Sequence, residues 1–479
     1  MTDQTHVDAT EDRLPISLKL SWATGALGVA LLMNGISALS LVYMVSVLQM
    51  EPWLAGALLA ITRLYDAFSD PIAGIMSDRT VSKMGRRRPF LLWGAVISGI
   101  SFFLCLASPF IGPFDKPLEG QGLLAAAYML GVLILYSTGY SLFNVPYMAM
   151  PAEMTDGYHE RSSIHGYRVM LASLGGMLAQ SGSLLAIGLT GKEAGRAGIS
   201  AEDWGTFLWI GAVGGALITI TMMVTFFGTA KARQIARPAR ELPWQVQLGA
   251  FFKNVPFMQI LSVKLLQLIG LSFSSSALIF MAVNILGLNP AKLAFIGITM
   301  VFTVMLLTQP LMMLGKIIGK RGGYIVSSVF TIGVALSWSF EGPGTVSDLE
   351  LIIRGVANGI AFAGNVAFAM SMLTDTMELD AHRTGMRREG MFTALYSFVE
   401  KIAAATGPFI VGVALSAAGF NPQTPPKEVT DGVRQAVLLG VTWAPTAFML
   451  ASIVILTFYK LDKSDLDKAK ADGLARDVG

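Results

Sequence analysis

Two aspartates, Asp66 and Asp70, lie four residues apart in the otherwise apolar stretch "RLYDAFSDPIAGIMSDRTVSKMGRRRPFLL". On a helix this spacing puts both carboxylates on one face. A charged side chain at the centre of a bilayer costs roughly 2.5–3.5 kcal/mol on insertion scales, so both need a compensating partner. Arg63 could pair internally with Asp66, but that pair would leave Asp70 without a partner. The pattern therefore favours a site for a cation that binds and leaves.

Such a site needs hard oxygen ligands around the cation. Ser69, together with Ser141 and Asn144 from another apolar stretch, could add neutral oxygens to those of the two carboxylates. Two close carboxylates favour protonation of one of them, whereas added neutral oxygens favour Na⁺. The sequence therefore predicts either Na⁺ or H⁺ as the bound ion, and no cofactor.

Lys401 is a third charged residue within an apolar stretch, "YSFVEKIAAATGPF". Its neighbour Glu400 points about 100° away around a helix, so a local ion pair has poor geometry. One interpretation has Lys401 reaching Asp66 and Asp70, where it stands in for the cation or senses its binding. The other has Lys401 extending its ammonium to the membrane interface.

Three other charged residues in apolar stretches are harder to interpret. Arg168 could bind a substrate hydroxyl or an anionic head group, or it could close a gate. The sequence assigns no role to Lys264 or Arg354.

The composition excludes an ordinary soluble protein. Of the 479 residues, 53% are hydrophobic and 14% are charged, whereas soluble domains carry about 25% charged residues. Repeated apolar stretches are long enough to cross a hydrocarbon core of ~30 Å. We therefore expect an all-α membrane protein with twelve transmembrane helices. They lie near residues 20–48, 53–77, 89–110, 122–150, 163–189, 205–227, 257–285, 292–317, 323–340, 349–374, 390–418 and 433–459.

Other functional classes find little support. The net charge of +3 is small and the basic residues are scattered among loops, so nucleic acid is not an expected partner. Cys105 is the only cysteine and cannot form an intramolecular disulfide. The four histidines show no metal-ligand spacing, and the apolar stretches offer no nucleophile–base pair, so we do not expect an enzyme.

The chain divides into two similar halves. We predict an N-terminal half over 1–227, a middle loop over 228–256, a C-terminal half over 257–459 and a charged tail over 460–479. "DPIAGIMSDRTVSKMGRRRPF" after span two resembles "QPLMMLGKIIGKRGGY" after span eight. Two pseudo-symmetric six-helix halves are the major facilitator architecture, with the substrate site between them at mid-membrane. Lysine and arginine concentrate in one set of loops, which places both termini in the cytoplasm.

Several motifs together resemble the glycoside–pentoside–hexuronide:cation symporter family. They are the run R-x-x-D-x-x-x-D-P-x-x-G from Arg63 to Gly74, then "DRTVSKMGRRRP", "FNVPYMAM", "ERSSIHGYR" and "TGMRREGMFTALYSFVEK". The resemblance covers nearly the whole chain and keeps the order of the motifs. It implies a multi-pass protein of the bacterial inner membrane that moves a small organic solute, a sugar or glycoside, together with Na⁺ or H⁺.

The resemblance also implies roles for individual residues. Asp66 and Asp70 match the cation-site carboxylates, and Ser69 and Ser141 fall where neutral ligands are expected. Lys401 matches the family's lysine that links the cation and substrate sites, and we expect Arg63 to take part in the coupling as well. The expected substrate-binding residues are Asn144, Met148, Arg168, Tyr396, Ser397 and Lys401.

The chain departs from the family pattern in the sugar pocket. Ala30 and Asn144 stand where two sugar-binding aspartates are expected, and Met148 replaces a stacking aromatic residue. The same family includes sodium-dependent lysophospholipid symporters, so a lysophospholipid is the alternative substrate, although Ala172 replaces a glutamate of their headgroup site. A non-transporting membrane sensor is a further alternative. The expected partners are the small-molecule or lipid substrate and membrane lipids, and we expect a monomer.

Overall fold

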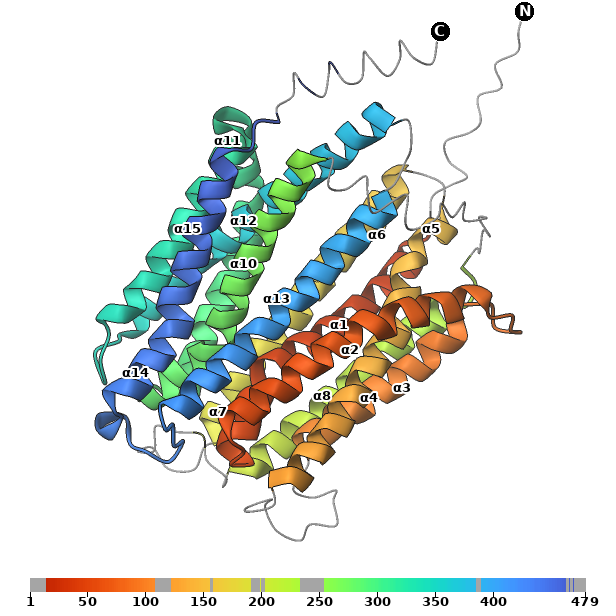
Figure 1. Ribbon diagram of the computed structural model, residues 1–479. Coiled ribbons are helices and arrows are strands. Elements are labelled where there is room, and N and C mark those ends of the chain that lie inside the picture. The colour runs from red at the N-terminus through yellow and green to blue at the C-terminus, as the bar shows by residue number, and fades with distance from the viewer. Residues whose placement is uncertain are drawn as a thin grey trace, which may run out of the picture.

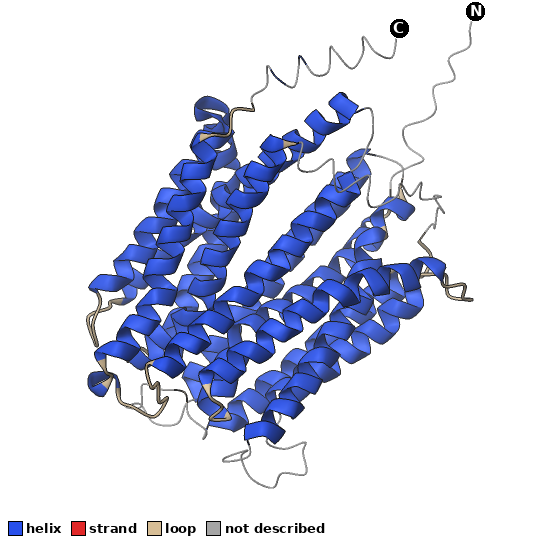
Figure 2. Cartoon of the chain, in the orientation of Figure 1, coloured by secondary structure: helices blue, strands red, loops and turns tan. Residues whose placement is uncertain are grey.

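The computed structural model describes residues 14–107, 122–155, 158–190, 199, 203–232, 254–384, 389–461, 465 and 468. Most of the predicted middle loop and most of the predicted tail lie outside these residues. Within them the regular structure is helical and contains no strand (Figure 2). The helices are α1 Ile16–Val42, α2 Pro52–Arg79, α3 Arg88–Leu106, α4 Gly122–Ala149, α5 Pro151–Met154, α6 Tyr158–Met177, α7 Ser183–Thr190, α8 Trp204–Gly228, α10 Val255–Phe280, α11 Pro290–Ser337, α12 Asp348–Thr384, α13 Glu389–Ala417, α14 Asp431–Leu438 and α15 Ala444–Thr457.

Ten helical stretches of the described chain are long and apolar enough to cross a membrane. Two features reconcile this number with the twelve predicted spans. α2 has 28 residues, which is long enough, but its charged residues set it apart from the other spans. α11 contains two spans, because Gly319 has non-helical dihedral angles (φ 78°, ψ 158°) and kinks the helix. Counting α2, and α11 as two spans, gives the predicted twelve.

The helices form two six-span halves that lie beside each other (Figure 1). In the first half α1 packs against α6 and α8, α3 packs against α4 and α8, and α4 packs against α2. In the second half α11 packs against α12, and α10 packs against α13 and α15. The two halves meet mainly where α2 lies along α13 and where α7 lies along α11. This is the all-α, two-half arrangement that the sequence predicts.

The first and seventh spans end in the same way. Each finishes in a π-helical turn, Tyr43–Val47 and Met281–Ile285. Two residues later the backbone turns through a positive φ, 53° at Gln49 and 67° at Gly287. A proline then begins the next helix. The matching turns show that the internal repeat extends to the backbone of the two halves.

Glycines allow the two halves to approach closely at one end of the bundle. A Cβ on Gly56 of α2 would lie 2.4 Å from the carbonyl oxygen of Pro408 in α13. The backbone N–H of Trp53 donates to Ser416 Oγ at 3.0 Å across the same contact. This end is opposite to the one at which α1 begins and α15 ends (Figure 1).

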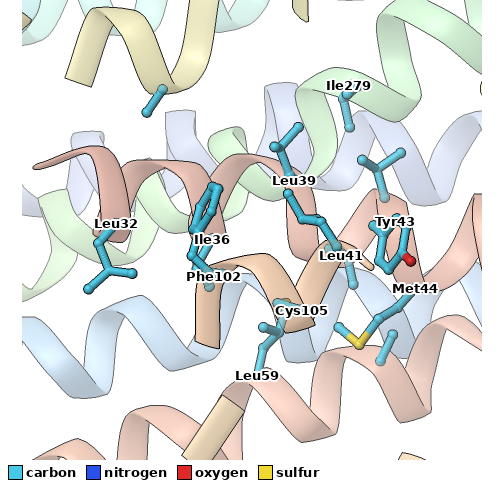
Figure 3. Packing of buried hydrophobic residues seen from close by; sticks show 14 of the residues in the cluster. Leu32, Ile36, Leu39, Leu41, Tyr43, Met44, Leu59, Phe102, Cys105 and Ile279 are labelled. Atoms are coloured by element: carbon cyan, nitrogen blue, oxygen red, sulfur yellow. The ribbon is translucent and has the colours of Figure 1, made fainter. Parts of the chain in front are cut away.

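The largest apolar core is built around α1 and draws on both halves. Leu39 and Tyr43, fully buried, lie in one cluster with Phe102 of α3 and Ile279 of α10 (Figure 3). Burying apolar surface contributes roughly 25 cal/mol per Å² against water, but lipid is itself apolar, so close packing matters more here than exclusion of water. The core holds α2 and α4 in place, and these two helices carry the charged site.

Candidate cation and substrate site

Asp66 lies at the interface of α2 and α4 and is only 2% exposed. Ser137 of α4 donates a hydrogen bond to its Oδ1. Arg63 Nη1 lies 3.4 Å from its Oδ2, one turn earlier on the same helix. The internal ion pair considered from the sequence is therefore present, and it occupies only one of the two carboxylates.

Asp70 finds its partner in the other half of the protein. Its Oδ2 forms an ion pair with the ammonium of Lys401 from α13. Ser141 Oγ donates to its Oδ1 at 2.5 Å. Lys401 Nζ also donates to the main-chain carbonyl oxygen of Asp66, at 2.7 Å. One ammonium thus ties the residues of both aspartates in α2 to α13.

Two helices supply the oxygens around Lys401. Helical spacing aligns Asp66 with Asp70 on α2, and Ser137 with Ser141 on α4, one turn apart in each case. Ser69 Oγ and Ser141 Oγ lie 2.7 Å apart, which links the two helices beside Asp70. A hydrogen bond of 3.0 Å between Tyr65 and Thr138 joins them again. The result is a compact set of carboxylate, hydroxyl and carbonyl oxygens.

The charges in this set balance. Arg63 and Lys401 supply two positive charges and the two aspartates supply two negative ones. An additional cation on Asp70 would leave an excess positive charge in the membrane unless the Lys401 ammonium moved away. The chemistry that this arrangement supports is exchange between the Lys401 ammonium and a mobile cation on the same carboxylate.

The predicted substrate-binding residues differ in their exposure. Met148 is 38% exposed, and Ser397 is half-buried. Arg168 is also half-buried, and its Nε has no hydrogen-bond partner in the described chain. The ring of Tyr396 lies with its centroid 6.0 Å from Lys264 Nζ.

Asn144 is placed differently from the other predicted cation ligands. Its side-chain amide donates to the hydroxyl of Tyr140 at 3.0 Å. Among the described residues no hydrogen bond joins it to Asp66 or Asp70. The oxygens that surround the two aspartates come instead from Ser69, Ser137 and Ser141 and from the backbone.

Comparison with known proteins establishes the family. The family model described as MFS/sugar transport protein matches residues 21–463. The chain belongs to this family. It is therefore a multi-pass membrane transporter of the major facilitator type and not an enzyme, and its resemblance to the glycoside–pentoside–hexuronide symporters is confirmed.

Full-length relatives of this transporter include named symporters. An uncharacterised symporter of Synechocystis is 25% identical, over 95% of each chain. The isoprimeverose transporter of Lactiplantibacillus pentosus is 24% identical, over 95% of this chain and 90% of its own. A solved structure of a bacterial homologue of the human lysosomal transporter Spinster, in an inward-facing and unoccupied conformation, matches with a TM-score of 0.61. It covers 97% of this chain and 99% of its own at 15% identity, which shows the shared fold alone.

The sequence reasoning missed two residues of the site. Ser137 donates to Asp66, and Ser37 of α1 accepts a hydrogen bond of 3.0 Å from Arg63 Nη2. Ser137 had a usable signal, because it precedes Ser141 by one helical turn on the same face of α4. Ser37 had none, since only the packing of α1 against α2 brings it to Arg63.

The structure also gives positions to the charged residues that the sequence left unassigned. Lys264 is 2% exposed, and its ammonium donates to Gln267 on the same helix at 2.9 Å. Glu400 is exposed and has no hydrogen bond or ion pair within 4.0 Å in the described part of the chain, but it interacts electrostatically with Lys264, Arg63 and Lys401. Arg354 forms an ion pair with Glu341.

Proposed function

We propose that this transporter is a cation-coupled symporter that carries a hydroxylated small solute of the sugar or glycoside class by alternating access. The single observation that carries the proposal is the ion pair between Asp70 and Lys401, which joins the two halves at the candidate cation site. A cation that binds Asp70 must compete with Lys401. Binding of the ion therefore weakens a contact between the two halves. In an alternating-access mechanism such contacts must form and break as the halves move.

The proposed cycle follows from the charge balance. Na⁺ or H⁺ binds at Asp66 and Asp70, with Ser69 and Ser141 as neutral neighbours, and frees the Lys401 ammonium. Lys401 then turns toward a solute lying between the halves, near Met148, Arg168 and Tyr396. If the ion raises the affinity for the solute, the solute must raise the affinity for the ion by the same factor.

The names of relatives support the solute class. One relative is named as a transporter of isoprimeverose, and this chain aligns with it over nearly its whole length. Polar groups that accept and donate hydrogen bonds, such as Asn144, Arg168 and Ser397, suit hydroxyl groups. We further propose that the protein works as a monomer in a bacterial inner membrane, with both termini in the cytoplasm.

Uptake into proteoliposomes tests this function. Labelled isoprimeverose, a labelled galactoside and labelled lysophosphatidylcholine are offered in parallel, each with an imposed Na⁺ gradient, an imposed H⁺ gradient or neither. We expect one of the two ion gradients to accelerate uptake of a sugar at least tenfold. Uptake of the lysophospholipid alone would replace the sugar proposal with the lipid alternative. An uptake rate that is the same with and without each ion gradient would contradict cation coupling.

A further inference from the structure

A groove opens on the outer surface of the second half, far from the charged site. It lies between the second segment of α11 and the beginning of α12 and has a volume of about 360 Å³. This volume falls within the range of ~300–1,000 Å³ that is typical of small-molecule sites. Val329, Phe330, Gly333 and Ile353 line it and are exposed on the surface of the bundle. In a membrane protein such a surface faces lipid.

One cationic side chain, Arg354, also lines the groove although it is only 6% exposed. Four contacts fix its guanidinium, one of them a hydrogen bond of 3.4 Å from Nη2 to the main-chain carbonyl oxygen of Ser337. Its Nε donates to Ser337 Oγ at 3.0 Å, and its Nη2 forms an ion pair with Glu341. Its Cζ lies 4.3 Å from the ring centroid of Trp338. The remaining nitrogen, Nη1, is buried and has no hydrogen-bond partner in the described chain.

A buried donor without a partner is unfavourable, so Nη1 favours an acceptor supplied from outside the protein. Glu341 already offsets the charge of the guanidinium. Burial opposes ionisation of Glu341, but hydrogen bonds from Thr345 and Arg354 outweigh it and hold its pKa below the ordinary value. Glu341 therefore stays ionised near neutral pH, and the missing acceptor needs only an oxygen lone pair, not a full negative charge.

The depth of Arg354 matches a particular part of a lipid. Arg354 lies six residues into α12 from Asp348, which at 1.5 Å per residue is ~9 Å along the helix axis. A hydrocarbon core of ~30 Å is flanked by interfacial regions. With the beginning of α12 at the outer edge of one such region, this depth corresponds to the boundary between head groups and acyl chains. The apolar residues Val329 and Phe330 continue the groove away from that end, toward the centre of the bilayer.

We propose that this groove is a binding site for one membrane glycerophospholipid. An acyl chain lies along Val329, Phe330 and Ile353, and an ester or phosphate oxygen accepts a hydrogen bond from Arg354 Nη1. The site goes beyond the transport function and does not depend on it. The bound lipid would support the segment of α11 that follows the kink at Gly319 by joining it to α12.

A pair of glycine substitutions tests the site. A Cβ added at Gly333 meets no atom within 4 Å, and the same is true of Gly131 on α4. Gly333→Leu therefore places an apolar side chain in the groove, whereas Gly131→Leu adds the same side chain elsewhere. Both variants and the wild type are purified in dodecyl maltoside and titrated with 1-palmitoyl-2-oleoyl-phosphatidylethanolamine, and bound lipid is counted by native mass spectrometry.

We expect one tightly bound lipid on the wild type and on Gly131→Leu, and a dissociation constant at least tenfold weaker on Gly333→Leu. Arg354→Lys keeps a charge for Glu341 but removes the Nη1 donor, and it should weaken the same binding event. Equal lipid binding by the wild type and Gly333→Leu would overturn the proposal. A groove occupied by detergent alone, or by a second copy of the chain that Gly333→Leu releases, would also overturn it.

Discussion

The ion pair between Lys401 and Asp70 distinguishes Lys401 from the other partners of the carboxylates on α2. The carboxylates on α2 are fixed by neighbours that stay in the first half, namely Arg63, Ser137 and Ser141. Among the residues that the structure describes, Lys401 is the one partner from the second half. Without Lys401 a transporter that releases its cation would have to carry an uncompensated Asp70 through the membrane, at a cost of roughly 2.5–3.5 kcal/mol.

Lys401→Met should therefore slow only the step in which the unloaded carrier reorients. We expect net uptake to fall on the order of 100-fold, the rate equivalent of that free energy. Exchange of labelled for unlabelled substrate does not need the unloaded step and should change less than about threefold. Proteoliposome assays of both modes give the comparison, with Lys401→Arg as the variant that retains the charge. Normal net uptake by Lys401→Met would show that Lys401 does not compensate Asp70.

The sequence predicts contacts within one helix better than contacts between helices. Asp66 and Asp70 could be placed together because helical spacing is a local property. The partner of Asp70 was one of two interpretations for Lys401, since the sequence does not show whether the ammonium crosses to the other half. Ser37 and Glu341 could not be assigned, because their contacts depend on how the helices pack against each other.

At the scale of elements, the repeated turn after the first and seventh spans shows how the two halves differ. Gln49 adopts the left-handed conformation that Gly287 adopts in the matching turn. A side chain in this conformation costs about 1–2 kcal/mol, whereas glycine enters it freely. The backbone is therefore strained at Gln49 in the first half and unstrained at Gly287 in the second half. The turns themselves could not be predicted, because no residue signal marks a π-helical turn.

Exchanging the two residue types should have opposite effects on stability. We expect Gln49→Gly to stabilise the protein by about 0.5–1 kcal/mol, because relief of the strain exceeds the added freedom of the unfolded chain. Gly287→Gln should destabilise it by about 1–2 kcal/mol. Thermal unfolding in detergent at one fixed scan rate provides the measurement. Shifts of the same sign in both variants would contradict this account of the turn.

At the scale of the whole molecule, the two halves are held together at the end that contains Trp53 and Ser416. The second contact between the halves lies at the same end, where the Asn289 amide donates to the carbonyl of Gly188 at 3.2 Å. Alternating access requires this end to separate once in each cycle. The close approach at Gly56 and Gly412 makes the closed arrangement compact, since a Cβ at either position would clash with backbone.

A reversible cross-link at this end should stop the cycle. The double variant Trp53→Cys/Ser416→Cys introduces thiols at two adjacent positions, because the backbone N of Trp53 and Oγ of Ser416 lie 3.0 Å apart. The natural Cys105 is buried and offers little competition. We expect oxidation to lower uptake at least tenfold and reduction to restore it, with each single-cysteine variant unaffected. Full cross-linking with unchanged uptake would show that this end does not open during transport.

The most direct test of the central claim compares three aspartates on α2 under an imposed ion gradient. Asp66→Asn and Asp70→Asn remove the proposed cation ligands, whereas Asp78→Asn alters a 58% exposed side chain near the end of the same helix. Substrate uptake is measured in proteoliposomes with and without the gradient that stimulates the wild type. The account predicts that the first two variants remain folded but lose the stimulation, and that Asp78→Asn keeps it. Stimulation retained by both Asp66→Asn and Asp70→Asn would contradict the assignment of the cation site.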